Sequence, residues 1–186
     1  MKFAAHLDTM LEELSVEERL TTFADLGLET YELWCWWDYD LDHLAATAKR
    51  LNLRPSAICT RFISLVDPDC HDAYLEALAE TIEASRKLGS RVIISQVGDE
   101  RPAVPRAEQK AALIGGLERA AALLAGTDLI LAAEPLNLLV DHAGYFLSRS
   151  DEAAEIIGTV DSPNVRMLFD IYHQQISEGN LISNIR

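Results

Sequence analysis

Hydrophobic residues follow two alternating patterns along the chain, short apolar runs and longer stretches with helical spacing. The short runs predict buried β-strands, and they occupy residues 2–7, 30–34, 56–59, 91–97, 129–134 and 164–170. In the stretches between them, apolar residues recur three or four positions apart, which predicts helices over residues 15–26, 41–51, 67–88, 105–124, from 150 onward, and 177–186. The pattern is therefore a repeated strand–helix unit.

Several of the predicted helices carry local start signals. The sequence SVEE at residues 15–18 has the form of a capping box. Asp67 and Pro68 fit an N-cap followed by proline in the first helical position. Ser150 is followed by two acidic residues, which suit the positive end of a helix dipole. No linker or low-complexity tract separates the units, so residues 1–186 are expected to form a single domain.

Strands that are apolar on both faces and alternate with helices predict a parallel sheet covered by helices. Two α/β architectures fit, an open doubly wound sheet and a (β/α)8 TIM barrel. The first strand-to-helix turn lacks a GxGxxG sequence and no GxxxxGK[ST] occurs, so the nucleotide-binding forms of the open sheet are not supported. A complete barrel usually needs about 250 residues. The six predicted units are about two units short of that.

Composition narrows the class of protein. The chain is 49% hydrophobic and carries a formal charge of −14, which repels a phosphate backbone and argues against nucleic-acid binding. No apolar run approaches the ~20 residues of a membrane helix, and the N-terminus lacks a secretory pattern. The three cysteines, an odd number without CxxC spacing, do not indicate disulfides or a thiolate zinc site. We expect a cytoplasmic protein without membrane partners.

Two carboxylates lie where parallel α/β folds place their chemistry, at the C-terminal ends of strands. Glu134 ends the run LILAAE, and Asp170 ends RMLFD. Either one alone is as consistent with an ordinary strand end as with a functional site. Two on successive strands favour a site, because a buried carboxylate must be paired, hydrogen-bonded or bound to a metal. Oxygen ligands suit Mg²⁺ or Mn²⁺, and nearby His173 could bind the metal or the substrate.

Other candidates give weaker signals. His6 ends the first strand and could reach the same pocket, although a structural role is the commoner one for a lone histidine. The aromatic segment WCWWDY at residues 34–39 could wall a pocket, join subunits or pack in the core. His142 could contact substrate or brace its loop. His43 and His71 are expected on solvated helix faces.

Five segments together resemble the hydroxypyruvate isomerase family. They are FAAHL, AEPLN, LVDHAGYFL, SPNV and LFDIYHQQISEGNL, at residues 3–7, 133–137, 139–147, 162–165 and 168–181. That family belongs to the xylose-isomerase-like TIM barrels, which also include sugar epimerases, inosose dehydratases and a DNA-repair endonuclease branch. The resemblance extends along the whole chain and is most specific between residues 134 and 181.

The resemblance implies a role for each matching residue. Glu134 would be both a metal ligand and a catalytic acid/base, Asp170 a second metal ligand, and His173 a substrate contact. Asn137 and His6 are further candidates for substrate binding. The family's third metal ligand lies on strand seven and its second catalytic glutamate on strand eight. The resemblance therefore implies a barrel truncated at its C-terminus, with little isomerase activity of its own and open edges that favour self-association.

The implied reaction interconverts hydroxypyruvate and 2-hydroxy-3-oxopropanoate by metal-assisted proton transfer through an enediolate. The substrate would thus be a small hydroxy-oxo acid or a sugar of carbohydrate metabolism. Two alternatives remain open at this point. One is another sugar isomerase, epimerase or inosose dehydratase on the same scaffold, and the other is a truncated protein without enzymatic activity.

Overall fold

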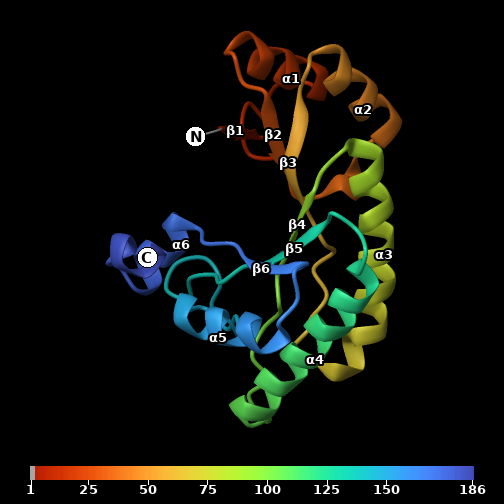
Figure 1. Cartoon of the computed structure of the whole chain (residues 1–186). Helices are drawn as coiled ribbons and strands as arrows, with labels where there is room; N and C mark the ends of the chain where they lie inside the picture. Colours follow the sequence, from red (N-terminus) through yellow and green to blue (C-terminus); the bar gives the residue numbers. More distant parts are fainter. Residues whose placement is uncertain (1–2) are drawn as a thin grey trace.

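A single parallel sheet organises residues 3–186, the part of the chain that the computed structural model describes (Figure 1). Its six strands are β1 (Ala4–His6), β2 (Thr30–Leu33), β3 (Arg54–Cys59), β4 (Val92–Ser95), β5 (Ile130–Ala133) and β6 (Val165–Met167). The main helices are α1 (Val16–Asp25), α2 (Leu41–Arg50), α3 (His71–Leu88), α4 (Arg106–Leu124), α5 (Ser150–Val160), α6 (Ile171–Ser177) and α7 (Leu181–Ile185). Two short 3₁₀ turns, η1 (Trp36–Asp38) and η2 (Pro68–Cys70), precede α2 and α3. The predicted strand–helix repeat is confirmed.

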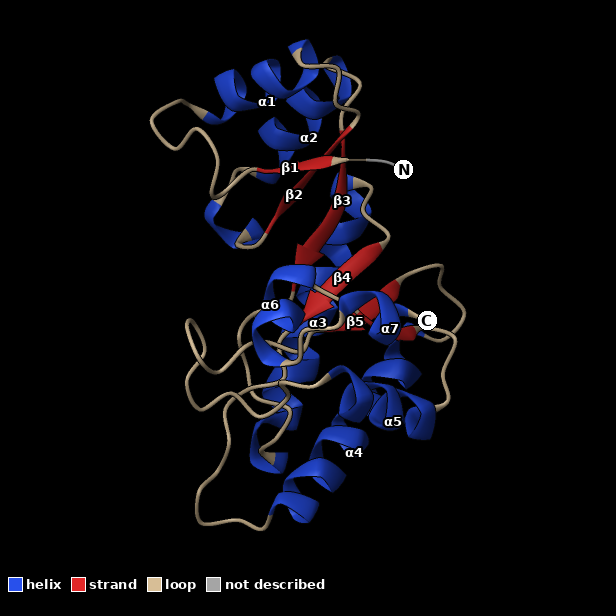
Figure 2. Cartoon of the chain, turned by 90° about the vertical axis from the view of Figure 1, so that its left-hand side faces the viewer, coloured by secondary structure: helices blue, strands red, loops and turns tan. Residues whose placement is uncertain are grey.

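The strands follow one another across the sheet in chain order, each paired in parallel with its sequence neighbours. The sheet is curved, and helices α1 to α5 follow one another around its outer side (Figure 1), while Figure 2 shows α1 and α2 beside the first strands and α4 and α5 beside the last. Strands β1 and β6 form the two edges and do not pair with each other. Over residues 3–186 the arrangement is that of a TIM barrel with six β–α units, not closed, as expected.

The main core lies between the sheet and the surrounding helices. Ile58 and Ile93 from the sheet, with Leu20, Leu78 and Leu117 from the helices, are completely buried there. A second, smaller cluster contains Ala57, Cys59 and Ile94, contacted by Val92 and Leu168. Successive residues of a strand point to opposite faces of a sheet. The small cluster therefore marks the inner, concave face, whereas the chemistry of a barrel is placed at the C-terminal ends of its strands.

Most helix signals have the predicted geometry, and the last predicted helix is wrong. Ser15 and Glu18 form the reciprocal capping box, in which the Glu18 carboxylate accepts from the Ser15 backbone N–H at 2.9 Å. Residues 177–186 do not form one helix. Helix α6 already ends at Ser177, and Gly179 and Asn180 both have positive φ, so the chain turns before it forms α7. Two consecutive residues in this conformation cannot continue a right-handed helix.

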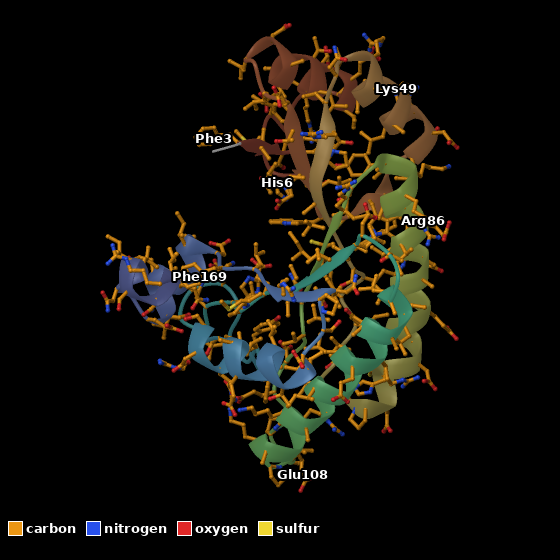
Figure 3. All side chains as sticks on the ribbon, in the orientation of Figure 1. Phe3, His6, Lys49, Arg86, Glu108 and Phe169 are labelled. Carbon is orange, nitrogen blue, oxygen red and sulfur yellow. The ribbon has the colours of Figure 1, made fainter. Side chains whose placement is uncertain are left out.

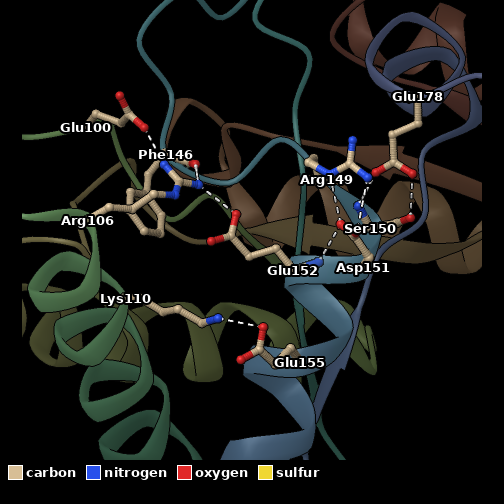
Figure 4. Close-up of polar contacts among 10 residues, drawn as sticks. All are labelled: Glu100, Arg106, Lys110, Phe146, Arg149, Ser150, Asp151, Glu152, Glu155 and Glu178. Atoms are coloured by element: carbon tan, nitrogen blue, oxygen red, sulfur yellow. Dashed lines mark hydrogen bonds and ion pairs between the residues drawn. The ribbon is translucent and has the colours of Figure 1, made fainter.

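Ion pairs and a stacked guanidinium connect α4 with α5 and the loop before it (Figure 4). Arg106 lies over the Phe146 ring, 4.3 Å from its centroid, and donates to the Phe146 carbonyl at 3.0 Å. The same guanidinium contacts the carboxylates of Glu100 and Glu152. An exposed pair by itself contributes only about 0–1 kcal/mol. The combined contacts nevertheless fix the position of the 134–149 loop, which leaves the sheet at β5.

A second set of contacts connects α6 to the start of α5 (Figure 4). The Glu178 carboxylate accepts hydrogen bonds from the backbone N–H and the hydroxyl of Ser150, the first residue of α5. Arg149 pairs with Asp151 beside them. A carboxylate at the N-terminus of a helix is stabilised by the helix dipole. Through this contact the end of α6 is held against α5.

None of the helices within residues 3–186 has both the length and the apolar character that crossing a lipid bilayer requires.

Candidate active site

The carboxyl ends of β5 and β6 bring together Glu134, Asp170 and His173. Glu134 follows β5 directly, and its backbone N–H donates to the Ser95 carbonyl at 3.1 Å. Leu168, just past β6, donates to the Ala133 carbonyl at 2.9 Å, so the two strand ends stay in register. Potential ligand atoms of Glu134, Asp170 and His173 all lie within 4.8 Å of one another. The two strand-end carboxylates and the histidine thus share one site.

Asp170 lies three residues past the end of β6 and starts helix α6. One oxygen of its carboxylate, Oδ1, accepts hydrogen bonds from the backbone N–H groups of Tyr172 at 2.7 Å and His173 at 3.2 Å. This is the geometry of an N-cap, for which aspartate is among the preferred residues. The cap orients the carboxylate towards Glu134 and fixes the first turn of α6, which carries His173. Only one carboxylate oxygen is used in this way.

Burial and two negative neighbours dominate the electrostatics of Glu134. Burial, together with the charges of Asp170 and Glu32, raises the pKa of its carboxyl to about 8. Within residues 3–186 no hydrogen bond from another side chain or backbone group reaches the carboxylate of Glu134. A buried carboxylate beside like charges, without a donor, is a poor site for an anion and a good one for a cation or a proton.

Glu32 is a third carboxylate of this site that the sequence did not identify. It lies on β2, and burial, together with the charge of Asp170, raises its pKa above the ordinary value, while a hydrogen bond with Ser56 opposes the change. A glutamate in the otherwise β-prone run TYEL was the available signal. A charged residue inside a strand with helices on its outer face points to the inner face of the sheet.

Tyr145 holds the backbone on which Glu134 lies. Its buried hydroxyl donates to the Glu134 carbonyl at 3.0 Å and accepts from the Val97 N–H at 2.6 Å. Val97 follows β4, so one hydroxyl joins the ends of two adjacent strands. His142 packs its ring against Tyr145 and against His173, with ring centroids 6.2 and 5.3 Å apart. His142 therefore braces its loop in this structure.

His173 and Asn137 are in direct contact. The side-chain nitrogen of Asn137 lies 2.8 Å from Nδ1 of His173, and the Asn137 backbone nitrogen lies 3.3 Å from the same atom. Asn137 is completely buried, whereas His173 is partly exposed. Burial lowers the pKa of the His173 imidazole, and the neighbouring Asp170 opposes that effect. The balance favours a neutral ring.

His6 ends the edge strand β1, whereas Phe169 follows β6 at the opposite edge of the sheet (Figure 3). Its ring packs against Trp34 with centroids 4.3 Å apart, and neither ring nitrogen has a hydrogen-bond partner within residues 3–186. Burial lowers its pKa, which the charge of Asp8 opposes. His6 is not part of the group formed by Glu134, Asp170 and His173.

The remaining aromatic and histidine candidates separate into different environments. Trp36 is a core residue whose indole N–H donates to the Cys59 carbonyl at 3.1 Å, while Trp34 is 44% exposed. The expectation of a solvated His71 is wrong. Its side chain is buried under α4, with Nε2 2.9 Å from the Leu65 carbonyl. Gly116 permits this approach, since a Cβ there would lie 2.7 Å from a Leu65 methyl.

A cavity of about 440 Å³ lies beside the site. Its lining includes Gln96, Arg101, His142 and Tyr145, together with Phe62 from the loop after β3. These residues follow the C-terminal ends of β3, β4 and β5. The cavity is therefore on the side of the sheet where Glu134 lies, and Tyr145 contributes to both.

Comparison with known proteins agrees with this architecture. The family model of the xylose isomerase-like TIM barrel matches residues 20–186. The chain belongs to this family. A human protein provisionally named hydroxypyruvate isomerase is 32% identical across the whole chain, which spans 72% of that relative. The hydroxypyruvate isomerase of Escherichia coli strain K12 is 30% identical, again over the whole chain and 74% of its own length.

Two further similar proteins, one relative in sequence and one solved structure, carry other names. A 2-oxo-tetronate isomerase of Cupriavidus necator is 26% identical over the whole chain and 74% of its own length. The crystal structure of a protein from Brucella melitensis, described as AP endonuclease, family 2, is 26% identical and superposes with a TM-score of 0.92. That superposition covers 99% of this chain and 74% of the other. The curated relatives are named isomerases of small sugar acids.

The donor set at the strand ends fits a divalent metal ion. Glu134 and Asp170 supply carboxylate oxygens close to each other, and the burial and like charges that raise the pKa of Glu134 disfavour its ionised form unless a cation lies beside it. Hard cations such as Mg²⁺ prefer oxygen ligands and are held by one or two carboxylates with several waters. The residues present therefore fit a divalent metal ion, and Glu134 and Asp170 are the residues that would hold it.

Proposed function

We propose that the site in this chain is that of an isomerase of short hydroxy-oxo acids, with hydroxypyruvate and 2-hydroxy-3-oxopropanoate as the interconverted pair. The observation that supports this most directly is Glu134, a strand-end carboxyl whose potential ligand atom lies within 4.8 Å of those of Asp170 and His173. Without metal, burial and like charges raise its pKa to about 8, and a general acid/base works best when its pKa is near the working pH. The names of the relatives support the same class of substrate.

In this reaction a proton moves between neighbouring carbons. Glu134 removes a proton from C3 of hydroxypyruvate, which leaves an enediolate. A proton is then returned to C2, and the C3 hydroxyl passes its own proton to the C2 oxygen as it becomes the aldehyde carbonyl. Positioned proton transfer of this kind contributes about 10²–10⁴-fold. A divalent cation, Mg²⁺ or Mn²⁺, held by Glu134 and Asp170 supplies positive charge that makes the substrate C–H more acidic.

Neighbouring side chains hold the substrate in this proposal. His173 contacts a substrate oxygen, since it lies within 4.8 Å of both carboxylates. His6 on β1 is a further candidate for contact with substrate, since its two buried ring nitrogens have no hydrogen-bond partner within residues 3–186. The adjoining cavity, with Arg101 in its lining, gives room for an acid longer than three carbons. A four-carbon 2-oxo-tetronate is therefore the second candidate substrate, as in the Cupriavidus relative.

We further propose a cytoplasmic enzyme that self-associates and takes no nucleic acid. The three cysteines are free thiols, which suits a reducing compartment. The edge strands β1 and β6 leave backbone groups available for pairing with another copy. The acidic charge of −14 disfavours a phosphate backbone.

The sharpest test follows the first proton transfer alone. In D₂O with Mg²⁺ or Mn²⁺, the chain should exchange the C3 hydrogens of hydroxypyruvate for deuterium, as measured by proton NMR. Glu134→Gln and Asp170→Asn should each abolish exchange while circular dichroism stays nearly unchanged, and the exposed α4 variant Glu118→Gln should behave as wild type. Exchange that persists in both site variants would refute the assignment.

The same assay distinguishes the candidate substrates. Net isomerisation is measured in parallel with hydroxypyruvate, 2-oxo-tetronate, ketohexoses and inosose. We expect the short acids to exchange hydrogen faster than the ketohexoses or inosose. A preference for a ketohexose would indicate an epimerase, and a preference for inosose a dehydratase. If metal-dependent proton transfer occurs with a ketohexose or inosose but neither short acid exchanges hydrogen, the proposed substrate class is contradicted.

A further inference from the structure

The hydrogen bonds around Asn137 fix the orientation of its side-chain amide. The carbonyl oxygen Oδ1 accepts from the backbone N–H groups of Val140 at 2.9 Å and Asp141 at 3.3 Å. A backbone N–H can only donate, so the oxygen of the amide must face these two groups. The NH₂ group must then face the other side, where it donates to the Asp141 carboxylate at 2.9 Å. The assignment of oxygen and nitrogen follows from the network itself.

This orientation directs two donors at one nitrogen of His173. The Asn137 NH₂ group lies 2.8 Å from Nδ1, and the Asn137 backbone N–H donates to the same atom at 3.3 Å. An imidazole nitrogen that accepts hydrogen bonds cannot carry a proton. In a neutral histidine the proton is then on the other nitrogen, Nε2.

We infer that Asn137 is a positioning residue that locks His173 in the Nε2–H tautomer, so that His173 offers the substrate a hydrogen-bond donor and does not ligate the metal. The donor function rests on the function proposed above, whereas the tautomer does not. An Nε2 atom that carries a proton has no lone pair for a cation. Of the three residues grouped at the strand ends, only Glu134 and Asp170 then remain as ligands.

The position of Asn137 explains why it acts through His173 rather than on substrate itself. Its side chain is completely buried, and both ends of the amide are engaged in the loop and with His173. The Asp141 carboxylate that receives its NH₂ group also accepts from the Tyr172 hydroxyl at 2.8 Å. The network therefore joins the 137–141 loop to the first turn of α6. A donor held in this way can stabilise negative charge that develops on a substrate oxygen.

Nitrogen-15 NMR of the labelled 186-residue chain tests the tautomer without any substrate. Long-range proton–nitrogen spectra are recorded above the ordinary histidine pKa, and His173→Gln identifies the His173 signals by their loss. We expect an unprotonated shift for Nδ1 and a protonated shift for Nε2, both unchanged when Mg²⁺ is added. A protonated Nδ1, or loss of the Nε2 proton on adding Mg²⁺, would overturn the inference.

Asn137→Asp is the matching variant, because it keeps the shape of the side chain but replaces the donor with an acceptor. The proton of His173 should move towards Nδ1, and deuterium exchange into hydroxypyruvate should fall by about 10²–10³-fold, the usual effect of losing one such donor. The control is Asn164→Asp. Asn164 is also buried, and its amide donates to the Thr127 and Leu129 carbonyls, away from this network. The control should lose stability while the His173 shifts stay as in wild type.

The outcomes separate this inference from the proposed function. Protonated Nδ1 in a wild-type chain that still exchanges hydrogen would refute the lock and leave the isomerase proposal standing. The expected tautomer in a chain that exchanges no hydrogen would support the lock and refute the proposed function. If Asn137→Asp does not fold, the wild-type spectrum with and without Mg²⁺ still decides the tautomer.

Discussion

Replacing Glu134 with Gln should make the stability of the protein less dependent on pH. Burial and the charges of Asp170 and Glu32 raise the pKa of this carboxyl from 4.5 to about 8 in the folded chain. Between these values the folded protein holds a proton that the unfolded chain has lost, so the free energy of unfolding falls as the pH rises. Each pKa unit corresponds to about 1.4 kcal/mol, so the full cost of ionised Glu134 is about 5 kcal/mol above pH 8. Below pH 4.5 this cost disappears.

The accessible part of this change can be measured by urea denaturation without added metal. The isoelectric point is about 4.6, so a comparison between pH ~6 and pH ~9 avoids the region of lowest solubility. Over that interval the wild type should lose about 3 kcal/mol more than Glu134→Gln, from the ~1.4 kcal/mol per unit between pH 6 and 8. This is a large part of a total stability of ~5–15 kcal/mol. The exposed variant Glu118→Gln is the control, and its curve should run parallel to the wild type.

Wild type and Glu134→Gln share all their other titrating groups. Subtracting the free energy of unfolding of one protein from that of the other at each pH therefore cancels the contribution of those groups. If wild type and Glu134→Gln show parallel dependence on pH, with equal denaturant slopes, then Glu134 titrates near its ordinary value. In that case either the carboxyl is solvated or a neighbouring group compensates its charge. Both possibilities would remove the reason for assigning the acid/base role to this residue.

Three further variants test the other parts of the site. Asp170→Asn should weaken Mn²⁺ binding in a calorimetric titration, while the capping hydrogen bonds to α6 are largely kept, since asparagine caps helices about as well as aspartate. His173→Asn should lower turnover by at least tenfold, and equal loss of Mn²⁺ affinity would make it a ligand instead. Tyr145→Phe removes the hydroxyl that bonds to the Val97 N–H and to the backbone carbonyl of Glu134. Because both backbone groups then lack a buried partner, the free energy of unfolding measured in urea should fall by about 1–3 kcal/mol.

The sequence predicts the strand–helix repeat and the two strand-end carboxylates because both depend on local patterns. Runs such as LILAAE are apolar throughout, and a carboxylate after such a run must lie at the end of the strand. The parallel arrangement then brings the ends of β5 and β6 together, which places Glu134 near Asp170. Periodicity and topology suffice for this part of the site.

Other parts depend on contacts between distant segments. Tyr145 joins Val97 to Glu134 through its hydroxyl, and nothing in the loop sequence indicates that partner. Glu32 reads as one residue of a β-prone run, and a shift of one residue in register would turn it to the outer face. The burial of His71 cannot be predicted from its own helix, because the face of α3 that meets α4 depends on a close approach at Gly116.

The unfavourable charge of the site also predicts how a metal ion should bind. A cation and a proton compete for Glu134, whose pKa without metal is about 8. Below that pH each ion bound must displace nearly one proton, so the affinity for Mn²⁺ should rise about tenfold per pH unit and level off above pH 8.

Calorimetry in two buffers of different ionisation enthalpy measures the released proton directly. Glu134→Gln should release none, bind Mn²⁺ weakly, and lose the dependence on pH. Release of no proton by the wild type below pH 8 would mean that the ion does not use Glu134. At 100 times its dissociation constant the ion should stabilise the wild type by about 2.7 kcal/mol, about half of the folding cost of ionised Glu134. The carboxylate that destabilises the metal-free fold is therefore the group that couples metal binding to folding.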